Sequence, residues 1–339
     1  MSKRGLRTTV WLGVALGAAC LAAFAWNAPW SEIGRVLAGA DGTLIVLAGG
    51  FLLMTSVARA WRWRHLLGEA PVSFRHRLSS TLIGFAGNNT LPGRLGEPLR
   101  CWMLSRLDRR IDFWRAAGSL VVERVFDLTA AITLLGIFLL LAPAAAATDT
   151  ALIRRIDHDA VRIAFVVVVA AGGLVILAGR RIGGRGGRWS GLATRLEALQ
   201  SGFAGLHSLR ALALTILYTG ILWASMVTFE LLMLRAFGFT QLGLAHAVGL
   251  LVVLCFAIAL PQAPAGLGVV QIASQTTLTA LYGVPLAPAK AFAIGLWVCQ
   301  VGIVVGAGAV ALWAEGYSVA DVRRARGSIG AFEAPVSPE

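Results

Sequence analysis

The sequence predicts an all-α fold: a polytopic integral membrane helix bundle of about eight transmembrane helices, with one or two re-entrant or broken helices. Two observations predict this class. Of the 339 residues 57% are hydrophobic, only 14% are charged, and the mean hydropathy is +0.75. So few charges could not cover the surface of a soluble domain of this length. The apolar residues also come in runs of about 17 to 25, the length that a helix needs to cross a bilayer.

Eight apolar runs are long enough, or nearly so, to be transmembrane helices. They are, in chain order, Thr8–Trp26, Gly42–Ala60, Ala116–Ala142, Ile163–Ala178, Ala211–Leu234, Leu242–Leu260, Gly266–Tyr282 and Ala291–Ala314. A further stretch, Leu78–Leu91, is moderately apolar but too short and too polar to span, so we interpret it as a re-entrant or half-buried hairpin. Gly266–Tyr282 has a second interpretation as a re-entrant half-helix, which would make the number of crossings odd.

The positive charges give the expected topology. The net charge is +13, and most arginines lie between hydrophobic runs, as they do in loops that are retained in the cytoplasm. The basic residues that mark this side are Lys3, Arg4, Arg7, Arg62, Arg64, Arg75, Arg77, Arg106, Arg109, Arg110, Arg115, Arg180, Arg181, Arg185, Arg188, Arg195, Arg323, Arg324 and Arg326. We therefore expect a multi-pass protein of the cell inner (plasma) membrane with its N-terminus and C-terminus in the cytoplasm. No continuous basic domain is present, so anionic lipid headgroups are the expected partners of these charges, and nucleic acid is not.

The domain organisation is expected to be simple. Residues 1–315 are predicted to form a single transmembrane domain, and residues 316–339 a short, basic and disordered cytoplasmic tail. Leu192–Leu206 spaces its leucines on one helical face and fits an interfacial helix. The four cysteines are scattered without a CxxC pair or a His-rich tract, so no metal, disulfide or cofactor is expected. Two pairs of glycines have the GxxxG spacing that permits close helix packing, Gly13 with Gly17 and Gly302 with Gly306.

The stretch Gly87–Arg100 (GNNTLPGRLGEPLR) is the most informative about function. Proline and glycine break a helix and free backbone N–H and C=O groups. At membrane depth such groups persist only where protein buries them or a wet cavity receives them. A helix break here would hold a polar headgroup or an ion, and the alternative is an ordinary cytoplasmic turn. The helix-breaking residues are Pro92, Gly93 and Gly96, and the candidates for substrate binding are Asn88, Asn89, Arg94, Glu97 and Arg100.

A second candidate group opens an otherwise apolar helix within Ser119–Leu128 (SLVVERVFDL). Glu123 and Asp127 are four residues apart and share a face, whereas Arg124 lies about 100° round the helix. Charges in the middle of a membrane cost about 2.5–3.5 kcal/mol each on insertion scales, so they need partners, and Arg94, Glu97 and Arg100 could neutralise them. Two alternatives remain open: a salt-bridge knot that only fixes the fold, and side chains at headgroup level that face water.

The third candidate group is Leu260–Gln271 (LPQAPAGLGVVQ). It loosely echoes the first motif, and paired helix breaks in two halves of a transporter point to the substrate site. Glu230 and Arg235, near the end of the preceding span, are interpreted as snorkelling residues. The helix-breaking residues of the third group are Pro261, Pro264, Gly266 and Gly268, and its candidates for substrate binding are the amides of Gln262 and Gln271.

At these three motifs the chain resembles the family of the transmembrane region of lysylphosphatidylglycerol synthases, which is also described as flippase-like. The resemblance runs from about Arg59 to Trp313. It depends on an ordered set of motifs: Arg59 with Arg62-Trp63; Asn89, Pro92, Arg94, Gly96, Glu97 and Arg100; Glu123-Arg124 with Asp127; and Pro264, Gly266 and Gly268. Two departures occur at the last motif, where Ala265-Gly266 replaces a Gly pair and Gln271 stands near an acidic position of the family.

The resemblance implies a lipid-translocating module. The soluble aminoacyl-transfer domain of full-length synthases is missing from the sequence, so we do not expect this chain to make lysyl-lipid alone. The leading hypothesis is a membrane lipid transporter, a flippase-like protein that moves or binds an anionic phospholipid or a lipid-linked headgroup. The alternatives are a membrane-embedded enzyme that acts on a lipid or polyprenyl-linked substrate, and a non-transporting partner in a membrane complex. The oligomeric state is left open.

Overall fold

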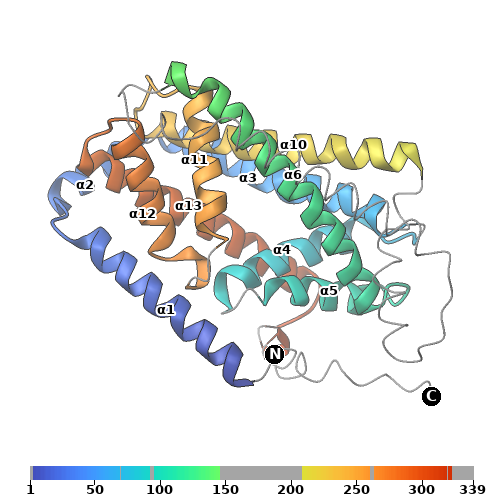
Figure 1. Ribbon diagram of the computed structural model, residues 1–339. Coiled ribbons are helices and arrows are strands. Elements are labelled where there is room, and N and C mark those ends of the chain that lie inside the picture. The colour runs from blue at the N-terminus through green and yellow to red at the C-terminus, as the bar shows by residue number, and fades with distance from the viewer. Residues whose placement is uncertain are drawn as a thin grey trace.

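The computed structural model describes residues 3–68, 70–91, 95–145, 208–259, 263–318 and 320–322. Within these ranges every regular element is helical, which confirms the all-α class. The predicted span Ile163–Ala178, the predicted interfacial helix Leu192–Leu206 and most of the predicted tail lie outside the described residues. The elements (Figure 1) are α1 (Lys3–Ala25), α2 (Trp30–Ala38), α3 (Gly42–Leu66), α4 (Phe74–Thr90), α5 (Gly96–Leu107), α6 (Phe113–Ala145), α10 (Leu209–Ala236), α11 (Leu244–Ala257), η2 (Pro264–Gly266), α12 (Val269–Thr276), η3 (Thr277–Leu281) and α13 (Leu286–Ala314).

Three of these helices, α3, α10 and α13, are long and apolar enough to cross a membrane by themselves. The pair α1 and α2 forms a fourth candidate span, which is bent by 93°. These helices confirm a polytopic membrane protein with at least one broken helix. The total number of crossings stays a prediction.

The bend between α1 and α2 is caused by the residues at the bend and is stabilised by a residue far away in the sequence. Pro29 precedes α2, and Asn27 has a φ of 50°, so the helix cannot continue through this segment. The ammonium group of Lys290, a residue of α13 that is 2% exposed, donates to the carbonyls of Phe24 (2.6 Å) and Trp26 (3.1 Å) at the end of α1. These carbonyls have no helical partner because α1 stops here, and the lysine satisfies them.

Helices α4 and α5 form a helical hairpin. The stretch Leu78–Leu91, which was predicted to be the whole hairpin, is part of its first arm, because α4 continues unbroken to Thr90 and the chain turns only after it. The two helices pack closely because glycine lines their contact. A Cβ atom on Gly84 would lie 2.6 Å from Cβ of Arg100, and one on Gly87 would lie 3.1 Å from Cα of Gly96. The open end of the hairpin is tied by Arg110, whose Nη1 donates to the carbonyl of Pro71 (3.3 Å). The chain thus enters and leaves this hairpin at one end, which is the connectivity that a re-entrant element requires.

A second helical hairpin is formed by α11 and α12. The predicted spans Leu242–Leu260 and Gly266–Tyr282 are both longer than the helices found there: α11 has 14 residues, and α12 has eight before a π-helical turn. Either helix alone is shorter than the roughly 20 residues that a span needs. The break after α11 ends the helical hydrogen bonding, as the prolines and glycines of this segment require, and we correct the two spans to a hairpin of short helices.

The tip of the second hairpin packs against the first hairpin. The single turn η2, at the tip of the second hairpin, packs against α4 of the first, and Figure 1 shows this loop beside the end of α4. Trp297 of α13 donates from Nε1 to the carbonyl of Ala265 (2.9 Å). On the other side a Cβ atom on Gly17 of α1 would lie 2.7 Å from Cβ of Ala263. Gly17 of the first GxxxG pair is therefore at a close contact, whereas Gly302 and Gly306 have no described atom within 4 Å of such a Cβ.

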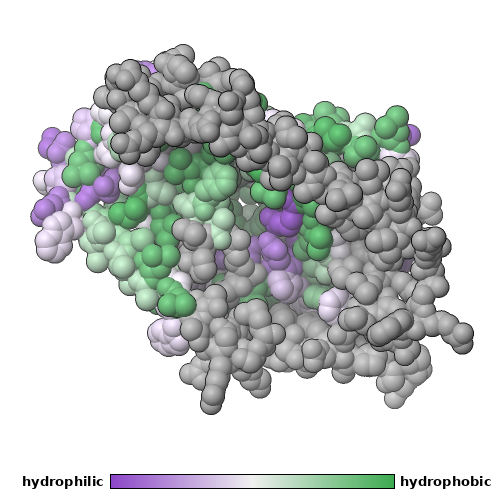
Figure 2. All heavy atoms as spheres, viewed as in Figure 1, coloured by the Kyte–Doolittle hydropathy of each residue, from purple (hydrophilic) through white to green (hydrophobic). Residues whose placement is uncertain are grey.

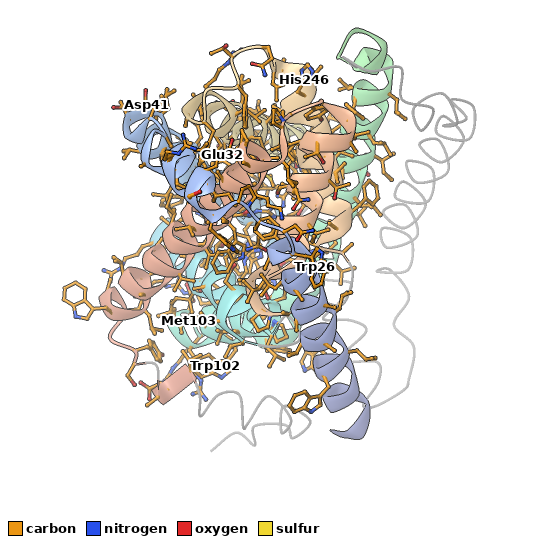
Figure 3. The ribbon with its side chains drawn as sticks, turned by 90° about the vertical axis from the view of Figure 1, so that its left-hand side faces the viewer. Trp26, Glu32, Asp41, Trp102, Met103 and His246 are labelled. Carbon is orange, nitrogen blue, oxygen red and sulfur yellow. The ribbon has the colours of Figure 1, made fainter. Side chains whose placement is uncertain are left out.

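The main hydrophobic core lies between α10, α11 and α13, where Leu222, Met233, Leu250, Phe292 and Leu296 are fully buried. Helix α3 packs along α10, and α4 packs along α13. Figure 3 shows that Glu32, Asp41 and His246 lie toward one end of the molecule, whereas Trp102 lies toward the opposite end. Polar residues also collect at mid-molecule, where hydrophilic surface is flanked by hydrophobic surface on both sides (Figure 2).

Candidate functional site

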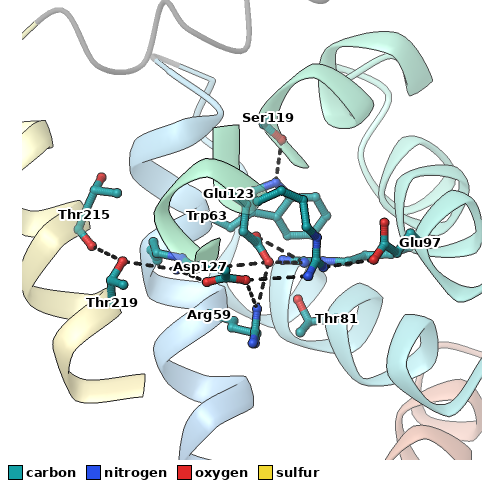
Figure 4. A network of polar contacts seen from close by, with 12 residues as sticks. Arg59, Trp63, Thr81, Glu97, Ser119, Glu123, Asp127, Thr215 and Thr219 are labelled. Atoms are coloured by element: carbon teal, nitrogen blue, oxygen red, sulfur yellow. Dashed lines mark hydrogen bonds and ion pairs between the residues drawn. The ribbon is translucent and has the colours of Figure 1, made fainter. Parts of the chain in front are cut away.

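A buried group of ionised side chains lies where α3, α5 and α6 meet (Figure 4). We call Arg59, Arg62, Arg100, Glu123 and Asp127 the charge cluster. Arg59 and Arg62 are three residues apart on α3, and the two carboxylates are four apart on α6, so each pair projects from one face of its helix. Arg100 comes from α5, on the return arm of the first hairpin. The glycine contacts of that hairpin therefore position one member of the charge cluster.

The two carboxylates are shared among the three arginines. Nη1 of Arg59 lies 3.1 Å from Oε1 of Glu123 and 2.9 Å from Oδ2 of Asp127. Nη1 of Arg62 lies 2.7 Å from Oδ1 of Asp127, and Nη1 of Arg100 lies 3.0 Å from Oε1 of Glu123. The cluster is thus one network rather than separate pairs.

The charge cluster is buried and carries one positive charge more than it carries negative. Glu123 and Arg62 are 0% exposed and Arg100 is 2% exposed, and three guanidinium groups face two carboxylates. Among the described residues, Nε and Nη2 of both Arg62 and Arg100 lack a hydrogen-bond acceptor. Nη2 of Arg62 is 3.3 Å from Oε1 of Glu123, an ion-pair distance without hydrogen-bond geometry. Buried donors without acceptors are costly. An additional anion with acceptor oxygens could bond to these donors and neutralise the excess positive charge.

Uncharged neighbours hold the arginines in place. The indole ring of Trp63 lies under Arg100, with the guanidinium carbon 3.9 Å from the ring centroid, and its Nε1 donates to Oγ of Ser119 (2.7 Å). Nη1 of Arg62 also donates to Oγ1 of Thr219 on α10 (3.1 Å). A stacked, hydrogen-bonded guanidinium has a fixed direction, which a ligand site needs.

Glu97 and Arg124 form a half-exposed pair beside the buried charge cluster. Their atoms Oε1 and Nη2 are 3.1 Å apart, and the side chains are 36% and 44% exposed. Glu97 therefore neutralises Arg124 and not the buried arginines. One alternative from the sequence was that Glu123, Arg124 and Asp127 on α6 all face water. It is wrong for Glu123 and Asp127, which are buried, and it fits only Arg124.

The amides of the first motif are engaged within the hairpin. Oδ1 of Asn88 accepts from the backbone N–H of Gly96 (2.9 Å), which ties the end of α4 to the start of α5. Nδ2 of Asn89 donates to the carbonyl of Phe85 (2.9 Å). These bonds give both residues a structural role. Pro92, Gly93 and Arg94 lie outside the described residues.

The amide of the third motif is engaged in the same way. Oε1 of Gln271, a residue that is 4% exposed, accepts from the backbone N–H of Gly268 (2.7 Å) and so caps the start of α12. Gly266 and Gly268 have positive φ values of 64° and 86°, and Pro264 begins the turn η2. The predicted break is thus present, and Gln271 stabilises it; among the described residues no hydrogen bond joins Gln271 to the charge cluster. Pro261 and Gln262 lie outside the described residues.

Three buried ionisable residues lie elsewhere than the sequence predicts. Arg62 and Arg77 were predicted in a cytoplasmic loop, but they are 0% and 2% exposed. Nη1 of Arg77 donates to the carbonyl of Ala60 (2.8 Å). Arg62 is on a helix because α3 extends six residues past its predicted end at Ala60. Arg77 is on α4, which begins at Phe74, four residues before the predicted start at Leu78. The spacing of Arg59, Arg62 and Trp63 on one helical face was the available signal. Glu230 was predicted to snorkel, but it is 3% exposed and lies inside the bundle.

Fold and site together define a helical membrane protein with a buried, positively biased charge cluster between broken helices. The model of the family described as "Lysylphosphatidylglycerol synthase TM region" matches residues 10–308. The chain therefore belongs to this family, as the ordered motifs predict.

A similar curated protein is "Glycosyltransferase AglD" of Haloferax volcanii. It is 29% identical over 185 residues, which are 50% of this chain and 29% of the relative. The aligned part thus spans less than a third of that relative's length.

Proposed function

We propose that the protein binds and translocates an anionic phospholipid or a lipid-linked anionic headgroup, and that the charge cluster is the headgroup site. The observation that carries the proposal is the excess of one buried positive charge together with the four guanidinium nitrogens of Arg62 and Arg100 that lack acceptors. A phosphate supplies both the missing negative charge and several acceptor oxygens. Arginine binds phosphate bidentately and does not lose its proton, which favours this ligand over a neutral one.

The half-exposed pair of Glu97 and Arg124 supports a route by which a headgroup passes from the outer surface of the protein to the buried charge cluster. Arg124 Nη1 lies 3.7 Å from Oδ2 of Asp127, so the pair is continuous with the cluster. An arriving headgroup would exchange with Glu97 at Arg124 before it reaches the buried arginines. Arg94, predicted as a further headgroup contact, belongs to the same proposal.

The proposed setting is the inner (plasma) membrane, with both termini in the cytoplasm and residues 1–315 as one transmembrane domain followed by a cytoplasmic tail, 316–339. The two hairpins that meet at η2 and α4 support a wet path near the middle of the bilayer, because broken helices in lipid need protein or water to satisfy their backbone.

The test is lipid movement in vesicles. Purified protein is expected to accelerate the movement of labelled phosphatidylglycerol between leaflets, and Arg100→Gln is expected to abolish this acceleration. Arg100→Lys keeps the charge without the planar fork and should retain part of it. Arg35→Gln, at an exposed position on α2, is the matched control. Equal lipid movement with and without protein refutes the proposal, provided that size-exclusion profiles show folded protein.

A membrane-embedded enzyme is the second candidate, and the observation that favours it is the relative named as a glycosyltransferase. Its acid/base groups would be drawn from Glu97, Glu123 and Asp127. All three are ion-paired, which disfavours proton transfer by them. A new lipid product, detected by mass spectrometry after incubation of lipid extracts with the protein, would support the enzyme instead of the transporter.

A further inference from the structure

A pocket between α3 and α10 lies apart from the charge cluster. Its volume is about 470 Å³, which is within the range of roughly 300–1,000 Å³ that small-ligand sites occupy. The last turns of α3 and the first turns of α10 line it. We call it the basic pocket, and its polar and aromatic lining residues are Trp61, Arg64, His65, Ser208, Arg210 and Tyr218.

The basic pocket and the charge cluster use different faces of the same two helices. On α3, at 100° per residue, Arg59 of the cluster lies about 160° round the helix from Trp61 of the pocket. On α10, Oγ1 of Thr219 accepts from Arg62 of the cluster, whereas the preceding residue, Tyr218, lines the pocket. Among the described residues that line the pocket, none belongs to the charge cluster. The pocket is therefore a separate site.

The basic pocket is positively charged. Two of its described lining residues are arginines, one is a histidine and none is acidic. Neither Arg64 nor Arg210 belongs to an ion pair within the described part of the chain. A third guanidinium group, that of Arg77, has its carbon 5.9 Å from the ring centroid of Trp61 in the pocket wall. Unpaired like charges around one pocket repel each other, so an anion between them would be stabilised.

Arg210 has an unfavourable position in its own helix. It is the second residue of α10, and no acidic residue lies in that first turn. The N-terminal turn of a helix repels cations and attracts anions. Arg64 and His65 lie in the last turn of α3, where positive charge stabilises a helix, so this role accounts for them without a ligand. The same role does not account for Arg210, whereas an anion in the pocket would compensate its charge.

The neighbours of the basic pocket direct its hydrogen-bond donors. The ring of His65 stacks with that of Tyr218 at 5.9 Å, and Tyr218 stacks with Trp61 at 6.3 Å. Oγ of Ser208 accepts from the backbone N–H of Ala211 (3.0 Å), which leaves its hydroxyl proton to be donated. Guanidinium groups, a hydroxyl group and the start of a helix together match the oxygens of a phosphate. The aromatic wall can contact the carbon atoms of the group that carries it.

We propose that the basic pocket is a second anion site, which binds the phosphate group of a phosphate ester between Arg64 and Arg210. The ester reaches the pocket either as a lipid headgroup or as a soluble phosphate compound, and the experiment distinguishes these sources. The inference does not rest on the proposed function, because the two sites share no residue.

The experiment follows the imidazole ring of His65 by nuclear magnetic resonance. The chain has five histidines, so purified protein with ¹³C-labelled histidine in detergent gives few ring signals, and His65→Gln assigns that of His65. Glycerol 3-phosphate is the soluble probe, short-chain phosphatidylglycerol is the lipid probe, and glycerol is the comparison without phosphate. At least one phosphate probe is expected to shift the His65 signal in a saturable manner, and glycerol is not. A response to only one probe identifies the source, and a response to both identifies a general phosphate ester site.

Two double variants test the role of the arginines. Arg64→Gln with Arg210→Gln is expected to weaken binding about 100-fold, at about tenfold for each arginine. Arg35→Gln with Arg109→Gln removes the same charge at exposed positions elsewhere and should bind as the wild type does. If the first double variant does not fold, Arg210→Gln alone serves, with a loss of about tenfold.

The outcomes are decided by folded protein only, as shown by size-exclusion profiles. No saturable shift with either phosphate probe overturns the inference. So does equal affinity in the two double variants. Lipid movement in vesicles is not a readout here, so a failure of the proposed function leaves this measurement unaffected.

Discussion

At the scale of single residues, Glu123 is the hub of the charge cluster. Its carboxylate lies within 3.1 Å of Nη1 of Arg59, 3.3 Å of Nη2 of Arg62 and 3.0 Å of Nη1 of Arg100. One buried anion thus serves three cations on two helices. Because its desolvation is offset by these partners, removal of the Glu123 carboxylate would leave three buried guanidinium groups with only the carboxylate of Asp127.

Replacement of Glu123 is therefore expected to destabilise the fold strongly. We predict that Glu123→Gln lowers the free energy of unfolding by about 3–5 kcal/mol, since three buried guanidinium groups would then share one carboxylate. Denaturant unfolding in detergent measures this change. Glu97→Gln is the matched control, with an expected change of at most about 1 kcal/mol, because its partner Arg124 is half-exposed. Similar stabilities for the two variants would contradict the central role of Glu123.

Of the charge cluster, Glu123, Asp127 and Arg100 could be predicted as site candidates from the sequence, but Arg59 and Arg62 could not. A sequence shows only which residues lie nearby along the chain, whereas Arg62 pairs with Glu123 and Asp127, which are 61 or more residues away. Glu230 shows the same limit in the opposite sense. Its sequence neighbours do not reveal whether the side chain points toward the bundle or toward a membrane interface, so snorkelling was the wrong interpretation.

At the scale of elements, both hairpins depend on glycine at close backbone approaches. In the first hairpin a Cβ atom on Gly96 would collide with the carbonyl oxygen of Gly84, which is backbone and cannot move aside without separating α4 from α5. That contact fixes the register of α5 and, with it, the position of Arg100.

We predict that Gly96→Ala displaces α5 and abolishes lipid movement, even though alanine is the better helix former. Lower thermal stability of the purified variant and loss of lipid movement in vesicles are the two readouts. The control is Gly136→Ala on α6, where a Cβ atom would meet no described atom within 4 Å; it should be neutral or slightly stabilising. Wild-type activity in Gly96→Ala would show that the helix approach is less tight than we describe.

Two glycines, one in the second hairpin and one in the loop before α13, allow the cost of backbone strain to be compared with the cost of close packing. Gly268 (φ 86°) and Gly283 (φ 68°) both have left-handed backbones, but a Cβ atom on Gly268 would also collide with the carbonyl oxygen of Gly17 on α1. Gly283→Ala is expected to cost about 1–2 kcal/mol from strain alone. Gly268→Ala should cost clearly more, because α1 must also move, and unfolding measurements on both variants compare the two. Equal losses would remove the packing argument.

The elements themselves were predictable in kind but not in length. The apolar run Gly42–Ala60 ends where arginines begin to appear in the sequence. Helix α3 nevertheless continues to Leu66, because Trp63 and Leu66 are fully buried and Arg62 is ion-paired with Asp127. The opposite error occurred at Leu242–Leu260 and Gly266–Tyr282, where apolar composition continues through a segment that proline and glycine break. Hydropathy measures the environment of a side chain and not the continuity of the backbone hydrogen bonds.

At the scale of the whole molecule, the distribution of charge predicts which end faces the cytoplasm. Glu32 and Asp41 lie toward the end opposite that of Trp102 (Figure 3), and the loop after α5 carries Arg109 and Arg110. The positive-inside rule assigns this basic loop to the cytoplasm and the acidic end to the outside.

Single cysteines test this orientation in a background without the four native cysteines. Glu32→Cys and Arg109→Cys replace exposed residues near the two ends. A membrane-impermeant maleimide added to intact cells is expected to label the first, and to label the second only after permeabilisation. The reverse pattern would invert the topology and place both predicted termini outside.

The hydrogen bonds of Lys290 to the end of α1 can form only late in the synthesis of the chain. Its ammonium group closes the end of α1 across 266 and 264 residues of sequence, so the ribosome delivers the two acceptors long before the donor. Until the last described long helix enters the bilayer, the carbonyls at the elbow of the first span must be held by water, lipid headgroups or an insertion factor. The bend between α1 and α2 can therefore gain its contact with Lys290 only near the end of synthesis. In nascent chains arrested before residue 290 this contact should be absent.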